Sequence, residues 1–227
     1  MLYFIKKVVE GVNAITDFVV GAVTTLFTKA IEWLRSKWEQ PKEIGTDAEY
    51  LPTANDQKII AEIRRRIVRR FPDGILNGMS ELSGEGRIQQ IKEVHQELCQ
   101  LYKLQDEDIQ LCFSDSTEMG PRCHGYCRWD VRMICLNKDF IMTTDLSYLK
   151  ECIDTVVHEL RHAFQHKAIQ ERTQWRDFGG VSREQVRGWA RNFYNYIPAD
   201  LDLKGYERQL VEYDARNFAR LSTEDLL

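Results

Sequence analysis

The chain has 227 residues, of which 43% are hydrophobic and 29% are charged, so it can bury a core and is not largely disordered. Its 31 Lys and Arg against 35 Asp and Glu give a net charge of −4, which argues against a basic nucleic-acid-binding protein, and we expect no nucleic-acid partner. Six cysteines are too few for a disulfide-stapled miniprotein. We therefore expect a reducing, cytoplasmic location, with export as an effector left open.

Residues 1–40 carry apolar side chains at helical spacing and predict an amphipathic helix. The longest uncharged stretch, residues 18–28, is shorter than the roughly 20 residues that a membrane span needs. This helix could pack on its own domain, cover a site, or contact a membrane surface or a partner protein, and the sequence leaves these alternatives open. Residues 41–55 contain Pro41, Gly45 and Pro52 without periodicity and predict a linker.

The remainder of the chain, residues 56–227, mixes helical and strand periods and predicts one α+β domain. Apolar stripes predict helices at about 56–71, 86–104, 146–165, 182–196 and 204–221. Alternating patterns predict strands at 108–113 and twice within 124–137, with a turn at about 129–132. The expected sheet is therefore small, with three strands.

Two clusters of charged or metal-binding side chains have structural interpretations, which we favour over binding sites. Five arginines between residues 64 and 70 indicate a solvated helix face paired with acidic groups rather than a phosphate-binding surface. Cys123, Cys127 and Cys135, together with His124, raise the question of a second zinc site. Because they are spread along predicted strands, we interpret them as small, half-buried side chains.

A chemically specific motif lies inside the predicted helix 146–165. His158, Glu159 and His162 form the pattern H-E-x-x-H. Residues four apart lie above one another on a helix, so both imidazoles can reach a single tetrahedral Zn²⁺ ion. Glu159 lies about 100 degrees around the helix from His158, from where it can act as a base on water at the open position of such an ion.

A catalytic zinc site commonly needs a third protein ligand. His166 lies about 12 Å from His158 along a rigid helix, too far to share the ion. In the last predicted helix, Glu212 stands among apolar positions and can point from a buried helix toward the motif. Asp177 and Asp214 are the alternative carboxylates.

The combination of H-E-x-x-H with a later E-x-x-A-x-x-F-A resembles the gluzincin metallopeptidases, most closely the ImmA/IrrE-type proteases. It is also similar to bacterial and phage zincins in which HELRHxxQ precedes a Y-x-x-Q-x-x-E-x-D-A-R helix. That second pattern is matched by Tyr206, Gln209, Glu212, Asp214, Ala215 and Arg216. The resemblance covers residues 126–219, and the 49 residues between His162 and Glu212 form a longer interval than the ImmA/IrrE pattern has.

The resemblance implies a zincin-like fold and a zinc-dependent peptidase that hydrolyses a protein or peptide substrate. His158, His162 and Glu212 would be the zinc ligands and Glu159 the general base. Gluzincins usually add an electrophile that stabilises the oxyanion. The candidates for that role are Tyr194, Tyr196, Tyr206 and Arg216.

Three further expectations concern the surroundings of this site. Asp154 or Asp214 could support the imidazoles by hydrogen bonding. A sheet edge near residues 132–136 could pair with an extended substrate. The alternative functions are a non-peptidase zinc amidohydrolase, and a non-catalytic, zinc-stabilised effector or interaction module. In a third alternative the N-terminal helix is the active part, and the zincin fold delivers or docks it.

Overall fold

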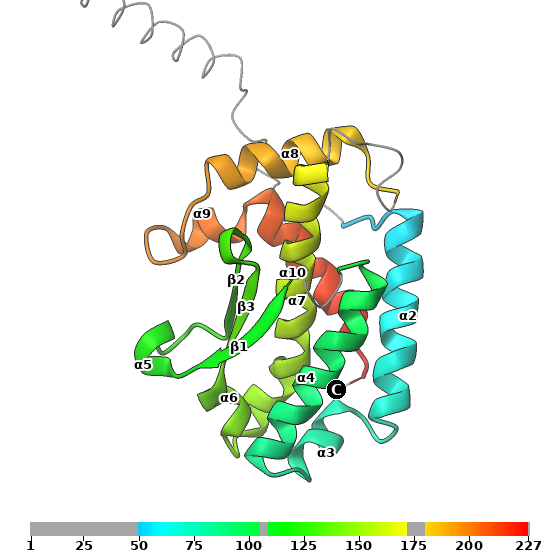
Figure 1. Cartoon of the computed structure of the whole chain (residues 1–227), viewed down its shortest axis with the longest axis vertical. Helices are drawn as coiled ribbons and strands as arrows, with labels where there is room; N and C mark the ends of the chain where they lie inside the picture. The colour runs from blue at the N-terminus through cyan, green and yellow to red at the C-terminus, as the bar shows by residue number, and fades with distance from the viewer. Residues whose placement is uncertain (1–49, 105–108, 172–179, 227) are drawn as a thin grey trace, which may run out of the picture. The chain divides into compact units, whose positions relative to one another are not determined.

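The computed structural model describes residues 50–104, 109–171 and 180–226 (Figure 1). The chain divides into two units, Met1–Lys42 and Glu43–Leu227, and the described residues all belong to the second. The predicted helix at 1–40 and most of the predicted linker therefore lie outside the described residues. Among the helices of the described residues, none combines the length and the apolar character that crossing a membrane requires.

The described residues form a mixed α+β structure that is mostly helical and contains one three-stranded sheet, as the sequence predicts. In chain order the elements are α2 (Ala54–Arg70), α3 (Ile75–Ser80), α4 (Gly84–Leu101), β1 (Gln110–Ser114), α5 (Ser116–Met119), β2 (Gly125–Arg128), the 3-10 turn η1 (Trp129–Val131), β3 (Met133–Asn137), α6 (Lys138–Met142), α7 (Leu146–Gln170), α8 (Arg183–Tyr194), α9 (Leu203–Glu207) and α10 (Leu210–Thr223). The short helices α3, α5 and α6 were not predicted, because segments of four to six residues are too short to show a helical period.

Helix α2 begins two residues earlier than predicted. The hydroxyl of Thr53 accepts a hydrogen bond from the backbone of Asp56, whose carboxylate accepts one from the backbone of Thr53, so the two residues form a capping box. Four of the five arginines of α2 are paired with acidic groups, as predicted: Arg65 and Arg66 bind Glu62, and Arg69 and Arg70 bind Glu97. Arg64 instead donates to the backbone carbonyls of Leu221 and Glu224.

The sheet has the order β1-β3-β2. β1 is parallel to β3, with Leu111 opposite Ile134, and β2 is antiparallel to β3, with Cys127 also opposite Ile134. The prediction that residues 132–136 form an edge strand is therefore wrong, because β3 is paired on both sides. Ile134 and Leu136 of β3 are buried, so the most apolar strand occupies the centre, and β2 takes one edge.

Helix α7 runs through the middle of the molecule, between the sheet and the helices α2 and α4 (Figure 1). It also packs against α10, α3 and α8, and buries apolar side chains from Leu149 to Ala168. Strand β2 lies directly against it. A Cβ atom at Gly125 would come within 2.8 Å of Thr155 and 2.9 Å of Leu136, so only glycine allows this approach one turn before His158.

The predicted helix at 204–221 is two helices, α9 and α10. Gln209, between them, is extended and turns its side chain to the backbone of Ile197, accepting from its N–H at 2.8 Å and donating to its carbonyl at 2.9 Å. Asn192 of α8 donates to Gln209 and accepts from the N–H of Val211 at 2.9 Å. These buried amides start α10 at Leu210 and so place Glu212 in its first turn.

Candidate metal centre

Two histidines of α7 and one glutamate of α10 converge, as the sequence predicts. The Nε2 atoms of His158 and His162 are 3.0 Å apart. Glu212 lies 3.4 Å from each imidazole, with Oε2 facing His158 and Oε1 facing His162. Within the described ranges this is the one group of three His, Cys, Asp or Glu residues whose ligand atoms could share a metal ion, and these atoms all lie within 4.8 Å of one another.

The separations in this group fit zinc. Two ligand atoms bound tetrahedrally at about 2.0–2.1 Å lie roughly 3.3 Å apart. The two imidazole nitrogens, 3.0 Å apart, are close to that spacing, and each lies 3.4 Å from its nearest carboxylate oxygen, which is Oε2 for His158 and Oε1 for His162. Two imidazoles with a carboxylate are a common ligand set for catalytic zinc. Glu212 is only 2% exposed, whereas His158 is partly exposed, so the group is open to solvent on the His158 side.

Glu159 is also buried beside this group. Burial raises the pKa of its carboxyl, the two histidines oppose that rise, and the charge of Glu212 adds to it. A carboxylate with a raised pKa in this position is suited to accept a proton from water and to release it again.

Charge couples His162 to Glu212. Burial disfavours the charged carboxylate of Glu212, but His162 and His158 outweigh this effect and hold the pKa of Glu212 well below its usual range. Burial likewise disfavours a charged imidazole at His162, but Glu212 outweighs it and raises the pKa of His162 to about 9. Without metal, therefore, a proton on His162 neutralises the buried carboxylate.

Zinc binding is expected to strengthen as the pH rises. Because the pKa of His162 lies above the 6.5 of an ordinary histidine, its proton stabilises the metal-free fold below pH 6.5, and this stabilisation is lost as the pH rises through about 9. Zinc requires the neutral imidazole, so each pH unit between those values raises the apparent zinc affinity by up to about tenfold. Chelator-competition titrations at three pH values measure this slope, and a flat profile would contradict the coupling.

Of the four candidates for an electrophile, two lie at the centre. The hydroxyl of Tyr196 donates to Oε1 of Glu212 at 2.7 Å. The ring of Tyr206 lies 6.2 Å from that of Tyr196, measured between ring centroids. Burial, and then the charge of Glu212, raise the pKa of Tyr206. Tyr194 is 70% exposed, and Arg216 donates to the carbonyl of Glu207, so neither is directed at the group.

The sequence analysis gave no role to Gln165, which is the direct hydrogen-bond partner of His162. Its Oε1 lies 2.9 Å from Nδ1 of His162. Asp214 reaches the imidazole only through Gln165, and Asp154 accepts from Thr223 instead. The signal that could have found Gln165 is its place one turn after His162, as the last residue of the HELRHxxQ pattern.

The remaining candidate ligands lie elsewhere or cannot be placed. The ring of His166 is stacked between Trp129 and Phe193, at centroid distances of 5.8 and 3.9 Å, and burial lowers its pKa to about 4. Cys127 and Cys135 lie on β2 and β3, and Cys123 donates to the carbonyl of Gly125. Asp214 faces Arg161. Asp177 is outside the described residues.

No family model, curated protein or solved structure matches the chain. The case for a function therefore rests on the geometry of this centre and on the chemistry of its side chains.

Proposed function

We propose that the chain is a zinc-dependent peptidase with a zincin-like fold of the gluzincin type. The observation that carries the proposal is the convergence of His158, His162 and Glu212 at zinc-ligand spacing, with Glu159 buried beside them. A merely structural zinc site usually has four protein ligands and no adjacent base. Three ligands with a neighbouring carboxylate favour hydrolysis.

Each side chain of the centre has a role in this proposal. When bound by the three ligands, zinc supplies a Lewis acid that acidifies water and polarises a carbonyl group. Glu159 accepts the proton of the attacking water and passes it to the leaving amine. Burial raises the pKa of Tyr196, so its hydroxyl keeps its proton at neutral pH and can donate to the oxyanion.

The substrate platform in this proposal is β2 rather than the strand predicted from the sequence. β2 is an edge of the sheet and lies against α7 near Thr155, one turn before His158, where Gly125 has no side chain and so lets the two elements approach closely. An edge strand presents free backbone groups that can pair with an extended peptide. A protein or peptide substrate therefore fits this centre better than a small amide.

The experiment that tests the proposed function is cleavage of an unbiased peptide mixture by the full chain. Cleavage that a chelator abolishes and added zinc restores is the expected result. A chain that binds zinc but cleaves no peptide, and hydrolyses no simple amide, would instead favour the non-catalytic alternative.

Replacing Tyr196 with phenylalanine is expected to lower kcat, measured in saturating zinc, by about 10²-fold, because one donor to the oxyanion is lost, with KM nearly unchanged. Tyr196 is chosen over Tyr206 because, at 39% exposed, it is the more accessible of the two tyrosines. The matched control is Tyr194→Phe, two residues away and outside the centre. Equal kcat values for the two variants would remove Tyr196 from the mechanism.

A further inference from the structure

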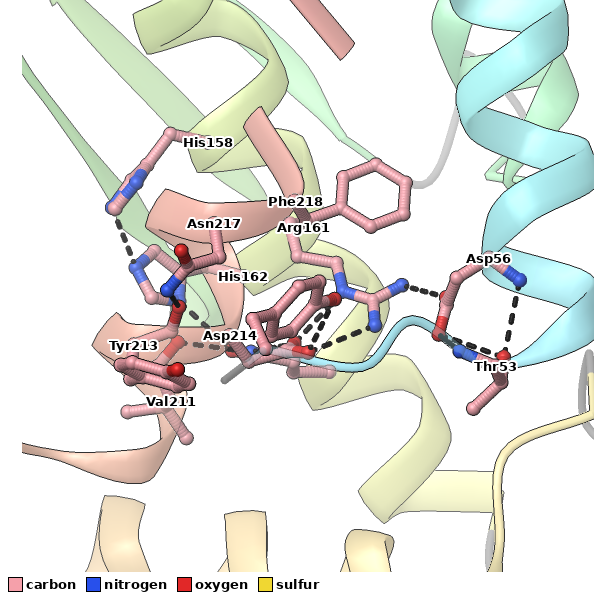
Figure 2. Close-up of polar contacts among 12 residues, drawn as sticks. Thr53, Asp56, His158, Arg161, His162, Val211, Tyr213, Asp214, Asn217 and Phe218 are labelled. Atoms are coloured by element: carbon pink, nitrogen blue, oxygen red, sulfur yellow. Dashed lines mark hydrogen bonds and ion pairs between the residues drawn. The ribbon is translucent and has the colours of Figure 1, made fainter. Parts of the chain in front are cut away.

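A buried chain of hydrogen bonds connects His162 to the first turn of α2. Figure 2 shows Arg161 lying between Asp56 and Asp214, with His162 and His158 beyond them. Arg161 donates to Asp56 at 2.7 Å and to Asp214 at 2.8 and 3.1 Å. Gln165 then connects Asp214, at 2.7 Å, to His162, at 2.9 Å.

Asp214 fixes which partner donates and which accepts in each of these hydrogen bonds. Its carboxylate can only accept, and four donors surround it: the hydroxyl of Tyr50 at 3.2 Å, two nitrogens of Arg161, and the amide nitrogen of Gln165. The same amide nitrogen donates to the carbonyl of Val211 at 3.1 Å. With two acceptors on its nitrogen side, Gln165 must turn its oxygen toward His162.

The orientation of Gln165 in turn decides the tautomer of His162. An oxygen at 2.9 Å from Nδ1 requires that Nδ1 carry a proton and donate it. In a neutral imidazole the lone pair is then on Nε2, the atom that faces His158 and Glu212. The direction of the hydrogen bonds, which Asp214 fixes, therefore leaves the lone pair of His162 on Nε2, the nitrogen that can bind a metal ion.

Burial makes this arrangement rigid. Asp56, Arg161, Gln165 and Asp214 are all buried, so water cannot readily replace a lost partner. The guanidinium of Arg161 also lies over the rings of Phe218 and Phe164, at 4.3 and 5.0 Å from their centroids. The arginine thus has one position in which it can serve both carboxylates.

Residues 50–56 supply the outer end of the chain of bonds. Tyr50 binds Asp214 directly, and Asp56, which Thr53 holds in the capping box, neutralises Arg161. Tyr50 and Thr53 are outside any helix, and their side chains bind Asp214 and Asp56. We propose that residues 50–56 are a positioning strap for the metal centre: while seated they hold His162 in its metal-binding tautomer, and their displacement lowers the metal affinity.

This inference rests on the metal binding in the proposed function, but not on peptidase activity. Its test is the zinc affinity of full-chain variants, measured by chelator competition. Loss of a residue that orients a metal ligand through hydrogen bonds typically costs about 10- to 100-fold in metal affinity, and we expect losses of that size for Asp214→Asn and Gln165→Leu. Tyr50→Phe removes one hydroxyl, leaves every charge in place, and is expected to cost about threefold to tenfold.

The control is Arg87→Met, which removes another buried arginine. Arg87 donates to the carbonyls of Met79, Ile141 and Thr143 and has no bond to the metal centre. It should destabilise the fold but change zinc affinity less than about twofold. A signature of the tautomer comes from ¹⁵N spectra of the metal-free chain above about pH 9, where the imidazole of His162 is neutral. His162 should there show a protonated Nδ1 and an unprotonated Nε2, and it should lose that single state in Asp214→Asn.

The outcomes separate the two proposals. If the wild-type chain binds zinc and the strap variants bind it equally well, or if Arg87→Met weakens binding as much as they do, the strap is refuted and the proposed function stands. If the wild-type chain binds no zinc, both fail. Should Asp214→Asn not fold, Tyr50→Phe decides alone, and an unchanged zinc affinity in that variant overturns the inference.

Discussion

Replacing Glu159 with glutamine is expected to lower kcat by about 10²- to 10⁴-fold while one zinc ion per chain remains bound. The amide has the size of the carboxylate but cannot accept the proton of the attacking water. Glu159 is buried next to the ligands without being one of them, and burial raises its pKa toward the range useful for proton transfer near neutrality. Zinc content and kcat, measured on the same preparation, check this expectation.

The matched control is Glu151→Gln, an exposed glutamate two turns earlier on the same helix. It should keep wild-type activity. If Glu159→Gln held zinc and cleaved substrate at the wild-type rate, Glu159 would not be the base. The inactive variant also offers a way to find substrates, because it should bind peptides at the centre and release them uncut.

Replacing Glu212 with alanine is expected to lower zinc affinity by about 10²- to 10³-fold. Four-ligand structural sites bind zinc with roughly 10–16 kcal/mol, so one ligand contributes about a quarter of that free energy. The variant should also bind zinc with a weaker dependence on pH, because the carboxylate that raises the pKa of His162 is gone. Competition titrations at two pH values measure both effects.

Glu207→Ala, an exposed glutamate just before α10, is the control for Glu212→Ala and should bind zinc normally. Unchanged zinc affinity in Glu212→Ala would contradict the ligand assignment. A loss of affinity in Asp177→Ala instead would transfer the role of third ligand to that residue, with the reaction class unchanged.

Local patterns in the sequence predicted most of the long helices and the pairing of the two histidines of the metal centre. The apolar residues of α7 recur every three or four positions, so its helical period is visible in the sequence, and Asp145 caps its first turn. His158 and His162 meet because a helix brings residues four apart together. Glu212 was predicted from its apolar neighbours and from a family resemblance, whereas its distances to the histidines depend on how α10 packs on α7.

Contacts between distant residues could not be predicted in this way. Arg161 reads as a solvated position in a helix, but it is fully buried because Asp56, 105 residues earlier, and Asp214, 53 residues later, neutralise it. The break before α10 depends on the side chain of Gln209 reaching Ile197 across a loop. The central position of β3 depends on β1 joining it in parallel, which strand periodicity does not specify.

X-ray absorption spectroscopy at the zinc edge tests the coordination chemistry most directly. The sample is the full chain loaded with one equivalent of zinc. We predict bound zinc with two imidazole nitrogens and oxygen ligands at about 2.0–2.2 Å. In Glu212→Ala, the carboxylate contribution should disappear. A wild-type chain that binds no stoichiometric zinc, or a spectrum without two histidine ligands, would contradict the metal centre and with it the assignment as a peptidase.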